Sequence, residues 1–300
     1  MSDALAVVSP PMPYFQEGDI RLYCGDNREV LPTLVGEPVD LIFTSPPYNI
    51  GNTTGGGFPD RFGHYRKSSG LAARGGGSAG AALAAGYDGY DDNMPHDEYV
   101  RWQNSFLLQC WELLSEKGAI YYNHKPRILN GELIAPVDYI PAELKKYIRQ
   151  EIIWKRSGGI NFSTAFYLPT HERIVVIAKR NFRLKSKGAS GVGDVWSIKQ
   201  ETDSDHPAPF PIELPLRAIE TVAPLLVLDP FCGRGATLRA AKRMGCAAIG
   251  IDQSKLFCDM AVGELRDETQ MLLPLPPVGG AEDEQSPLFP FSCEKEEVRG

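Results

Sequence analysis

The stretch LLVLDPFCGRGATLRAAKRMGCAAIGID, residues 225–252, decides the fold of this chain. Its first four residues, 225–228, are all apolar and predict a buried strand, after which an acid and two glycines form a turn. Residues 236–244 then predict a helix, and residues 247–251 predict a second strand that ends in another acid. A strand, a glycine turn, a helix and a further strand form the repeating unit of doubly wound α/β sheets.

The rest of the chain continues this alternation of strands and helices. The strand predicted at residues 39–44 is an apolar run, which is typical of a parallel strand buried on both faces. The helix predicted at residues 96–115 has apolar side chains at helical spacing, and Gly118 marks its end. Further strands are predicted at 21–24, 119–123, 151–154 and 173–178, and further helices at 27–34, 142–150, 212–222 and 254–266. The sequence therefore predicts an α/β fold with a doubly wound, mostly parallel sheet.

Length and composition fit one globular domain. The chain has 300 residues, of which 43% are hydrophobic and 23% are charged. We expect a single domain over residues 19–268, a flexible leader at 1–18 and a disordered acidic tail at 269–300. No apolar run approaches the roughly 20 residues that span a bilayer, and the start lacks the zones of a signal peptide. We therefore expect a cytoplasmic protein without a membrane partner. The six cysteines form no Cys-x-x-Cys pair, and no metal site is predicted.

The distribution of charge is more informative than the net charge of −7. Acidic residues gather in the tail, whereas basic residues form separate clusters, one between residues 179 and 187 and another between residues 61 and 74. Such clusters bind nucleic-acid phosphates if they converge on one face, and are otherwise ordinary solvated surface. Six basic side chains follow predicted strands closely and are candidates for contacts with phosphates or base edges: Lys125, Arg127, Lys155, Arg156, Lys179 and Arg180.

The segment Ser45-Pro46-Pro47-Tyr48 follows the strand predicted at residues 39–44, at the strand end where open α/β sheets bind ligands. The exocyclic amine of a nucleic-acid base is a poor nucleophile because its lone pair is delocalised into the ring. Two acceptors on its hydrogens, the Ser45 hydroxyl and the Pro46 carbonyl, would favour a tetrahedral nitrogen and release that lone pair. The prolines fix the backbone, and the Tyr48 ring can stack on a base extruded from a duplex. The alternative interpretation is a plain strand-ending turn.

The turn at residues 229–235 suits a nucleotide-containing cofactor. Gly233 and Gly235 let backbone amides approach a ligand closely, and the helix that follows offers its N-terminus to a carboxylate. Asp252 ends the next strand, where an acid can bind the two hydroxyls of a ribose. The three-glycine fingerprint of a nicotinamide site is absent from the sequence, which disfavours that cofactor.

Together these motifs resemble the DNA amino-methyltransferases of the permuted β group, which are of the restriction–modification type and methylate cytosine N4 or adenine N6. In that group, as in this chain, the amine segment precedes the cofactor segment. The resemblance covers roughly residues 20–265 and is carried by residues 22–26, 39–48, His171-Glu172, His206-Pro207, 211–214 and 227–231. It implies S-adenosylmethionine as the cofactor. It also implies a seven-stranded, circularly permuted sheet of the S-adenosylmethionine-dependent methyltransferase type.

The resemblance implies roles for particular residues. Ser45, Pro46, Pro47 and Tyr48 would form the catalytic motif of a direct transfer to a flipped base. The residues expected to bind the cofactor are Asp26, Thr44, His206, Phe210, Asp229, Phe231, Cys232, Gly233, Gly235 and Asp252. Asp252 would hold the ribose, Asp26 would lie near the adenine, and residues 206–211 would cover the methionine end. Double-stranded DNA is the implied partner. The sequence leaves open a homodimer and a companion restriction endonuclease.

The first letter of the amine motif bears on the target base. Family members with Ser-Pro-Pro-Tyr more often modify cytosine N4, whereas Asp-Pro-Pro-Tyr members mostly modify adenine N6. We therefore expect cytosine N4, with adenine N6 as the alternative. No Pro-Cys dipeptide is present, which removes the usual thiolate nucleophile of cytosine C5 enzymes. Methylation of RNA or protein amides is disfavoured by the permuted order, and an inactive DNA-binding regulator is disfavoured by the intact motif.

Two segments have the composition of loops. Residues 51–90 are rich in glycine, alanine and serine, a composition that buries too little apolar surface to order itself. We predict a mobile loop there, either a passive linker or a segment that orders over DNA after the catalytic motif. Residues 155–205 contain no compact inserted domain, so recognition of the DNA sequence is expected to fall on short loops.

Overall fold

The computed structural model describes residues 11–49, 94–129, 131–156, 167–200 and 210–268. The helical elements are α1 (Asn27–Val30), η1 (Leu31–Leu34), α3 (His96–Leu113), η2 (Pro136–Tyr139), α4 (Ala142–Lys145), η3 (Gly188–Val192), α5 (Glu213–Val222), α6 (Ala236–Met244) and α7 (Lys255–Asp267). The strands are β1 (Phe15–Glu17), β2 (Ile20–Cys24), β3 (Val39–Thr44), β4 (Leu114–His124), β5 (Arg127–Leu129), β6 (Glu132–Ile134), β7 (Ile148–Lys155), β8 (His171–Ala178), β9 (Val195–Ser197), β10 (Leu226–Asp229) and β11 (Ala247–Asp252). The predicted loop at 51–90, the tail at 269–300 and His206 lie outside the described residues.

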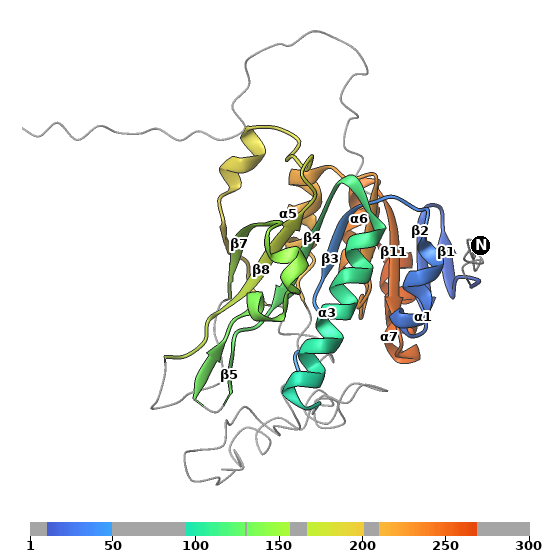
Figure 1. The fold of residues 1–300 in the computed structure, drawn as a ribbon. Coiled ribbons are helices and arrows are strands. Elements are labelled where there is room, and N and C mark those ends of the chain that lie inside the picture. The colour runs from blue at the N-terminus through green and yellow to red at the C-terminus, as the bar shows by residue number, and fades with distance from the viewer. Residues whose placement is uncertain (1–10, 50–93, 130, 157–166, 201–209, 269–300) are drawn as a thin grey trace, which may run out of the picture.

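One large sheet runs through the domain, with the strand order β1-β2-β11-β10-β3-β4-β8-β7-β9 (Figure 1). Strands β2, β11, β10, β3 and β4 are parallel to one another, whereas β8 is antiparallel to both of its neighbours. The run from β2 to β7 contains the seven strands that the family resemblance implied. The additional strands β1 and β9 have three residues each and are the two outermost strands of the sheet. Because β1 pairs with β2, the ordered sheet begins inside the segment predicted as a leader.

Helices cover both faces of the sheet, as a doubly wound fold requires. On one face, α5, α6 and α7 pack their apolar side chains against the sheet around Phe43, Tyr121 and Val227. On the other face, η1, α3 and η2 pack around Ile42, Tyr122 and Leu228. Figure 1 shows α3 lying across this second face. Among the described residues, no helix has both the length and the apolar character needed to cross a bilayer.

Two predicted boundaries were wrong. The helix predicted at residues 142–150 ends at Lys145, because the chain from Ile148 onward pairs with β8 and strand pairing prevails over helical propensity. Helix α3 ends at Leu113, and β4 begins at the next residue. Gly118 therefore does not end a helix but lies inside β4.

The close approach of β3 and β4 explains the glycine at position 118. A Cβ atom built on Gly118 would lie 2.7 Å from the backbone oxygen of Val39. The register between β3 and β4 shifts between Val39 and Leu41, which is a bulge in the ladder. Side chains larger than hydrogen are excluded there because the two backbones meet.

Candidate active site

The two motifs singled out in the sequence meet at one edge of the sheet, which is the edge formed by the carboxyl ends of the parallel strands. Strands β3 and β10 are parallel neighbours, with Leu41 beside Val227 and Ile42 beside Leu228. Both strands therefore end at the same edge, and the amine segment leaves β3 next to the glycine turn that leaves β10. Residues that are far apart in the sequence thus form a single candidate site.

The glycine turn is shaped by Asp229. Its carboxylate accepts hydrogen bonds from the Phe231 backbone N–H (3.1 Å) and from the Thr237 hydroxyl (2.6 Å). Gly233 and Gly235 have φ values of +51° and +81°, which L side chains rarely adopt. No side chain caps the N-terminus of α6 that follows, so its first N–H groups point toward the turn. The backbone here suits a bound carboxylate or other anion.

Asp252 ties the turn to the neighbouring strand. One carboxylate oxygen accepts from the Gly233 N–H (2.9 Å), and the other accepts from the Ser254 N–H (2.9 Å). Burial raises the pKa of Asp252, and these two hydrogen bonds oppose that shift. Each carboxylate oxygen has two acceptor sites, so Asp252 keeps capacity for the hydroxyls of a ribose.

Asp26 lies at the same edge, two residues beyond β2. Its carboxylate caps α1 by accepting from the Arg28 N–H (2.9 Å) and also pairs with the Arg28 guanidinium. The adjacent Asn27, which sequence reasoning missed, donates from its amide to the carbonyl oxygen of Pro230 (3.2 Å). The end of β2 is thereby fixed against the glycine turn.

The remaining predicted cofactor residues surround the turn. The Phe231 ring packs edge-on against Phe106 of α3, with ring centroids 5.0 Å apart. Cys232 is buried, and its backbone N–H donates to the carbonyl oxygen of Ile251 (3.0 Å). Phe210 packs edge-on against Phe43 of β3, at 5.2 Å between centroids. Phe231 and Phe210 therefore pack against the hydrophobic cores on the two opposite faces of the sheet.

Thr44 ends β3 beside the turn. Its hydroxyl is fully buried and makes no hydrogen bond of good geometry with the described residues. It is near enough to the Asp229 carboxylate to oppose, weakly, the rise in pKa that burial causes there. A buried hydroxyl with spare capacity is consistent with a polar ligand at this edge. The described residues therefore fit the cofactor that the family resemblance implied.

The amine motif belongs to a polar network in which Asn123 and Glu172 are buried and Ser45 and Tyr48 are half-buried. The Ser45 hydroxyl lies 2.7 Å from the Tyr48 hydroxyl, which donates to Glu172 Oε2 at 2.8 Å. The Asn123 amide nitrogen lies within 3.2 Å of Ser45 Oγ, 2.9 Å of the Tyr48 hydroxyl and 3.0 Å of Glu172 Oε2. Three strand ends, those of β3 and β4 and the start of β8, thus converge on Ser45.

Aromatic side chains support this network from the α3 side. The Tyr48 ring packs against His124, with ring centroids 4.7 Å apart. The Tyr99 hydroxyl of α3 lies 2.7 Å from the Pro47 carbonyl oxygen and 2.6 Å from His124 Nε2. Burial lowers the pKa of His124 to about 3, so the imidazole is neutral. One face of the Tyr48 ring is therefore in contact with protein.

Three of the predicted DNA contacts lie at this edge. Lys155 ends β7 and is exposed, whereas Lys125 is half-buried and burial lowers its pKa. The Arg127 guanidinium stands 5.7 Å from the centroid of the Tyr99 ring. These three residues therefore lie at or just beyond the ends of β4 and β7, at the same edge as the amine motif.

Arg156 directly follows β7, as predicted, but its side chain is almost fully buried. Its side chain is 7% exposed and pairs with Glu172, whose side chain is 6% exposed, at 3.3 Å. It also donates to the carbonyl oxygen of Pro169 at 3.0 Å. Arg156 therefore supports the polar network from inside and does not offer its charge to a phosphate.

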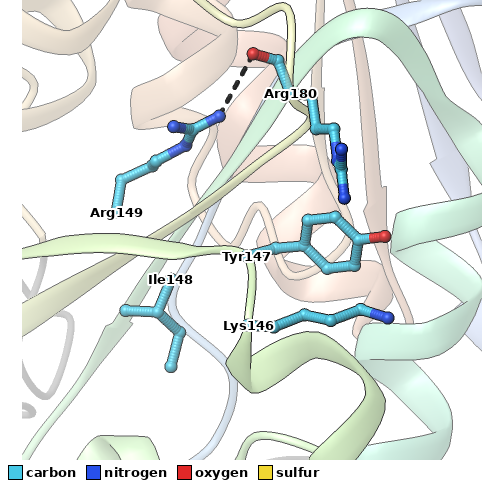
Figure 2. Close-up of a pocket in the computed structure, with 5 residues that line it drawn as sticks. All are labelled: Lys146, Tyr147, Ile148, Arg149 and Arg180. Atoms are coloured by element: carbon cyan, nitrogen blue, oxygen red, sulfur yellow. Dashed lines mark hydrogen bonds between the residues drawn. The ribbon is translucent and has the colours of Figure 1, made fainter.

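Lys179 and Arg180 lie at the opposite edge of the sheet. Strand β8 is antiparallel to β4, and its last residue, Ala178, pairs with Ala119, which lies beside Leu41 near the start of β3. Figure 2 shows Arg180 beside a pocket that is also lined by Lys146, Tyr147, Ile148 and Arg149. Arg149 donates to the backbone carbonyl oxygens of Lys179 (3.0 Å) and Arg180 (3.2 Å). Among the described residues, the basic side chains that follow β4 and β7 therefore lie at the opposite end of the strands from those that follow β8. The basic cluster predicted between residues 61 and 74 lies outside the described residues.

Sequence reasoning missed Asn123 and Tyr99, and it assigned no role to Glu172. Glu172 carried one signal, since it belongs to the His171-Glu172 pair matched by the family. Among the described residues, no group of three histidine, cysteine or acidic side chains is arranged to hold a metal ion.

Comparison with known proteins bears on the identity of this site. The sequence family N6_N4_Mtase, described as DNA methylase, matches residues 39–263, a range that contains both motifs. The chain belongs to this DNA methylase family. The methylase is similar to the Type II methyltransferase M.ScaI of Streptomyces caespitosus, with 25% identity over 298 residues, 87% of this chain and 86% of the relative. It is 25% identical over 276 residues to M.HpaI of Haemophilus parainfluenzae, covering 83% and 75% of the two chains.

Solved structures share the fold of this methylase. One is the PvuII DNA methyltransferase, described as cytosine-N4-specific, with a TM-score of 0.61 and 16% identity over 83% of this chain and 87% of that one. Another is TTHA0409 of Thermus thermophilus, described as a putative DNA modification methylase complexed with S-adenosyl-L-methionine. Its TM-score is 0.54 at 21% identity, over 83% of this chain and 93% of that one. The predicted family and the predicted methyltransferase fold are confirmed.

Proposed function

We propose that this DNA methylase transfers a methyl group from S-adenosylmethionine to the exocyclic N4 amine of cytosine in a short duplex site. The observation that carries the proposal is the shared edge of β3 and β10, where Ser45 follows one strand and the glycine turn follows the other. A nucleophile and a methyl donor held at adjacent strand ends need no further large motion to meet, so positioning supplies much of the acceleration.

The described residues offer a partner for each part of the cofactor. The open N-terminus of α6 suits the methionine carboxylate, and Asp252 has acceptor capacity for the ribose hydroxyls. Asp26 and the end of β2 lie on the side where the adenine would extend beyond the ribose. When bound, S-adenosylmethionine supplies a methyl group on a positively charged sulfur, which is an electrophile.

The target amine is assigned to Ser45 and Pro46. The Ser45 hydroxyl oxygen and the Pro46 carbonyl oxygen would accept hydrogen bonds from the two amine hydrogens of a flipped base. The neighbouring Pro47 is held in place through its own carbonyl by Tyr99. The serine at this position supports cytosine by family resemblance. Adenine N6 is the second candidate, because the same two acceptors fit its amine.

Duplex DNA is proposed to lie over the edge that carries Lys125, Arg127 and Lys155. Segment 51–90 and, within segment 155–205, the residues between the end of β7 and the start of β8 are proposed to supply sequence recognition, since β3 and β7 end at this edge and β8 starts there. Phosphate contacts would fix the register of the duplex, and loop contacts to base edges would select the site.

The test is to incubate mixed-sequence duplex DNA with the protein and S-adenosylmethionine carrying a tritiated methyl group. The DNA is then digested to nucleosides, and the labelled nucleoside is identified by chromatography. We expect N4-methyldeoxycytidine. We also expect Ser45→Ala to reduce the rate by about 100-fold while cofactor affinity stays the same, because one acceptor is lost. Label in N6-methyldeoxyadenosine would select the second candidate, and DNA binding without any label would indicate a regulator.

A further inference from the structure

We propose that Ser45, Tyr48 and Glu172 form a proton relay, in which Glu172 is the final acceptor of the proton that the target amine loses. The inference rests on the proposed function and deepens it. The chemistry requires such an acceptor, because an amine that gains a methyl group must release a proton to become neutral again. The relay is built from two side chains that follow β3 and one side chain of β8, more than 120 residues apart in the sequence.

The direction of the hydrogen bonds follows from the charge on Glu172. Its carboxylate pairs with the buried Arg156 at 3.3 Å and has no hydrogen to donate. The Tyr48 hydroxyl, 2.8 Å from Glu172 Oε2, must therefore be the donor in that bond. A tyrosine hydroxyl has a single hydrogen, so the 2.7 Å contact between Tyr48 and Ser45 must use the Ser45 hydrogen.

Asn123 fixes this direction from the neighbouring strand. The atom that faces Glu172 Oε2 at 3.0 Å must be the amide nitrogen, since two bare acceptors would repel each other. The same NH₂ group shares its two hydrogens among Glu172 Oε2 and the oxygens of Tyr48 and Ser45, so it faces both hydroxyls as a donor. Neither hydroxyl can therefore turn its hydrogen toward Asn123, and both hydrogens point along the chain toward Glu172.

As a consequence, the Ser45 oxygen is oriented to accept a hydrogen bond from the target amine. Its hydrogen is directed at Tyr48, and one of its two lone pairs faces the distant Asn123 donor at 3.2 Å. The other lone pair remains for an N–H of the target amine. A carboxylate two hydroxyls away thus determines that Ser45 acts as an acceptor and not as a donor.

The same chain can carry the proton away. As the amine nitrogen bonds to the methyl group, the methyl carbon–sulfur bond of the donor would break and leave its electron pair on the sulfur. One N–H bond of the amine then breaks, and the proton passes to Ser45 Oγ. Ser45 releases its own hydrogen to the Tyr48 oxygen, and Tyr48 releases its hydrogen to Glu172 Oε2. One N–H bond and two O–H bonds break while three O–H bonds form, and the charge on the nitrogen is neutralised by that of Glu172. Glu172 acts through Tyr48 and Ser45, so it is a positioning residue that also stores the proton.

The first test is the substitution Glu172→Gln. The amide would donate to Tyr48, turn the Tyr48 hydrogen toward Ser45 and fill the lone pair needed by the amine. We expect the single-turnover rate to fall about 100-fold, with unchanged dissociation constants for S-adenosylmethionine and for duplex DNA. The matched control is Glu151→Gln, which removes a carboxylate that pairs with Arg173 at 3.3 Å on the neighbouring strand and touches none of the relay residues. Its rate should equal that of the wild type.

The second test is Tyr48→Phe, which keeps the ring but removes the hydroxyl from the relay. It also serves if Glu172→Gln fails to fold because Arg156 loses its partner. We expect a loss of about 100-fold in rate, whereas a tyrosine that merely stacks on the base would keep its activity as phenylalanine. The double variant should lose no more than the larger single loss, because both changes break the same chain.

A spectroscopic measurement tests the relay without turnover. The ultraviolet resonance Raman spectrum of wild type minus that of Tyr48→Phe isolates Tyr48, and its tyrosine doublet reports whether the hydroxyl donates or accepts. We expect a strong donor in the wild type and an acceptor-type doublet in the Glu172→Gln background. The relay would be overturned by wild-type rates in both relay variants. It would also be overturned by multiplicative losses in the double variant, or by a doublet that does not change. An inactive wild type would instead overturn the proposed function.

Discussion

Asp229 shows how a single buried acid shapes a turn and makes stability depend on pH. Burial raises the pKa of Asp229 to about 7, although the hydrogen bonds from Thr237 and Phe231 oppose the shift. The ordinary value for this carboxyl is 3.8, which we take for the unfolded chain. Between these two values the folded state binds a proton that the unfolded state has lost. Raising the pH through this window therefore removes stability.

We predict that the free energy of unfolding of the wild type falls between about pH 4 and about pH 7, and that Asp229→Asn removes this part of the dependence. The difference should reach a few kcal/mol, since each pKa unit corresponds to ~1.4 kcal/mol. Urea unfolding at several pH values measures it. The difference between the two proteins isolates Asp229 from Asp252, whose pKa is also raised by burial. Parallel curves would show that Asp229 titrates near its ordinary value.

At the scale of the elements, the contact between β3 and β4 sets the position of the amine motif. Gly118 of β4 lies so close to β3 that an added Cβ would stand 2.7 Å from the Val39 oxygen. Ser45 follows β3, and Asn123 lies near the end of β4. A change in the spacing of these two strands would therefore shift two members of the polar network relative to each other.

We predict that Gly118→Ala lowers the free energy of unfolding by about 1–3 kcal/mol, because the backbone of β3 must move to admit the methyl group. Urea unfolding monitored by circular dichroism measures this loss. The matched control is Gly191→Ala, since a Cβ at Gly191 meets nothing within 4 Å and its φ is not positive. That variant should stay within about 0.5 kcal/mol of the wild type. Equal stability of both variants would mean that β3 and β4 adjust without cost.

At the scale of the whole molecule, positive charge lies at two opposite edges of the sheet while the net charge is −7. Lys155 belongs to the edge that carries the amine motif, and Arg180 belongs to the edge with the pocket in Figure 2. A duplex bound over the first edge is separated from the second by the length of the strands. We therefore assign the phosphate contacts to the edge that carries Lys155 and the amine motif.

We predict that Lys155→Ala weakens DNA binding and lowers the slope of log affinity against log salt concentration by about 1, as expected for one lost phosphate contact. Arg180→Ala should leave the affinity and the slope unchanged. Fluorescence anisotropy of a labelled duplex at several salt concentrations measures both quantities. If Arg180→Ala reduced the slope as much as Lys155→Ala, the duplex would have to reach the far edge.

Much of the fold could be predicted because its signals are local. The glycine turn and α6 follow from residues 225–244, and β3 was placed at 39–44 because these patterns depend on neighbours in the chain. The three-residue strands β1, β5, β6 and β9 were missed, since so short a segment carries no periodicity. Helix α4 was overextended because pairing between β7 and β8 is a long-range effect.

The sequence by itself determined the α/β class, the order of the elements, and the presence of an amine motif and a glycine turn. The tertiary structure alone decided that Glu172 and Asn123 join Ser45, that Arg156 is buried beneath them, and that Lys179 lies at the far edge. The physical reason is that periodicity shows which residues form a strand, but neither its direction nor its neighbour. The antiparallel insertion of β8 beside β4 fixes both, and with them the chemistry at each edge.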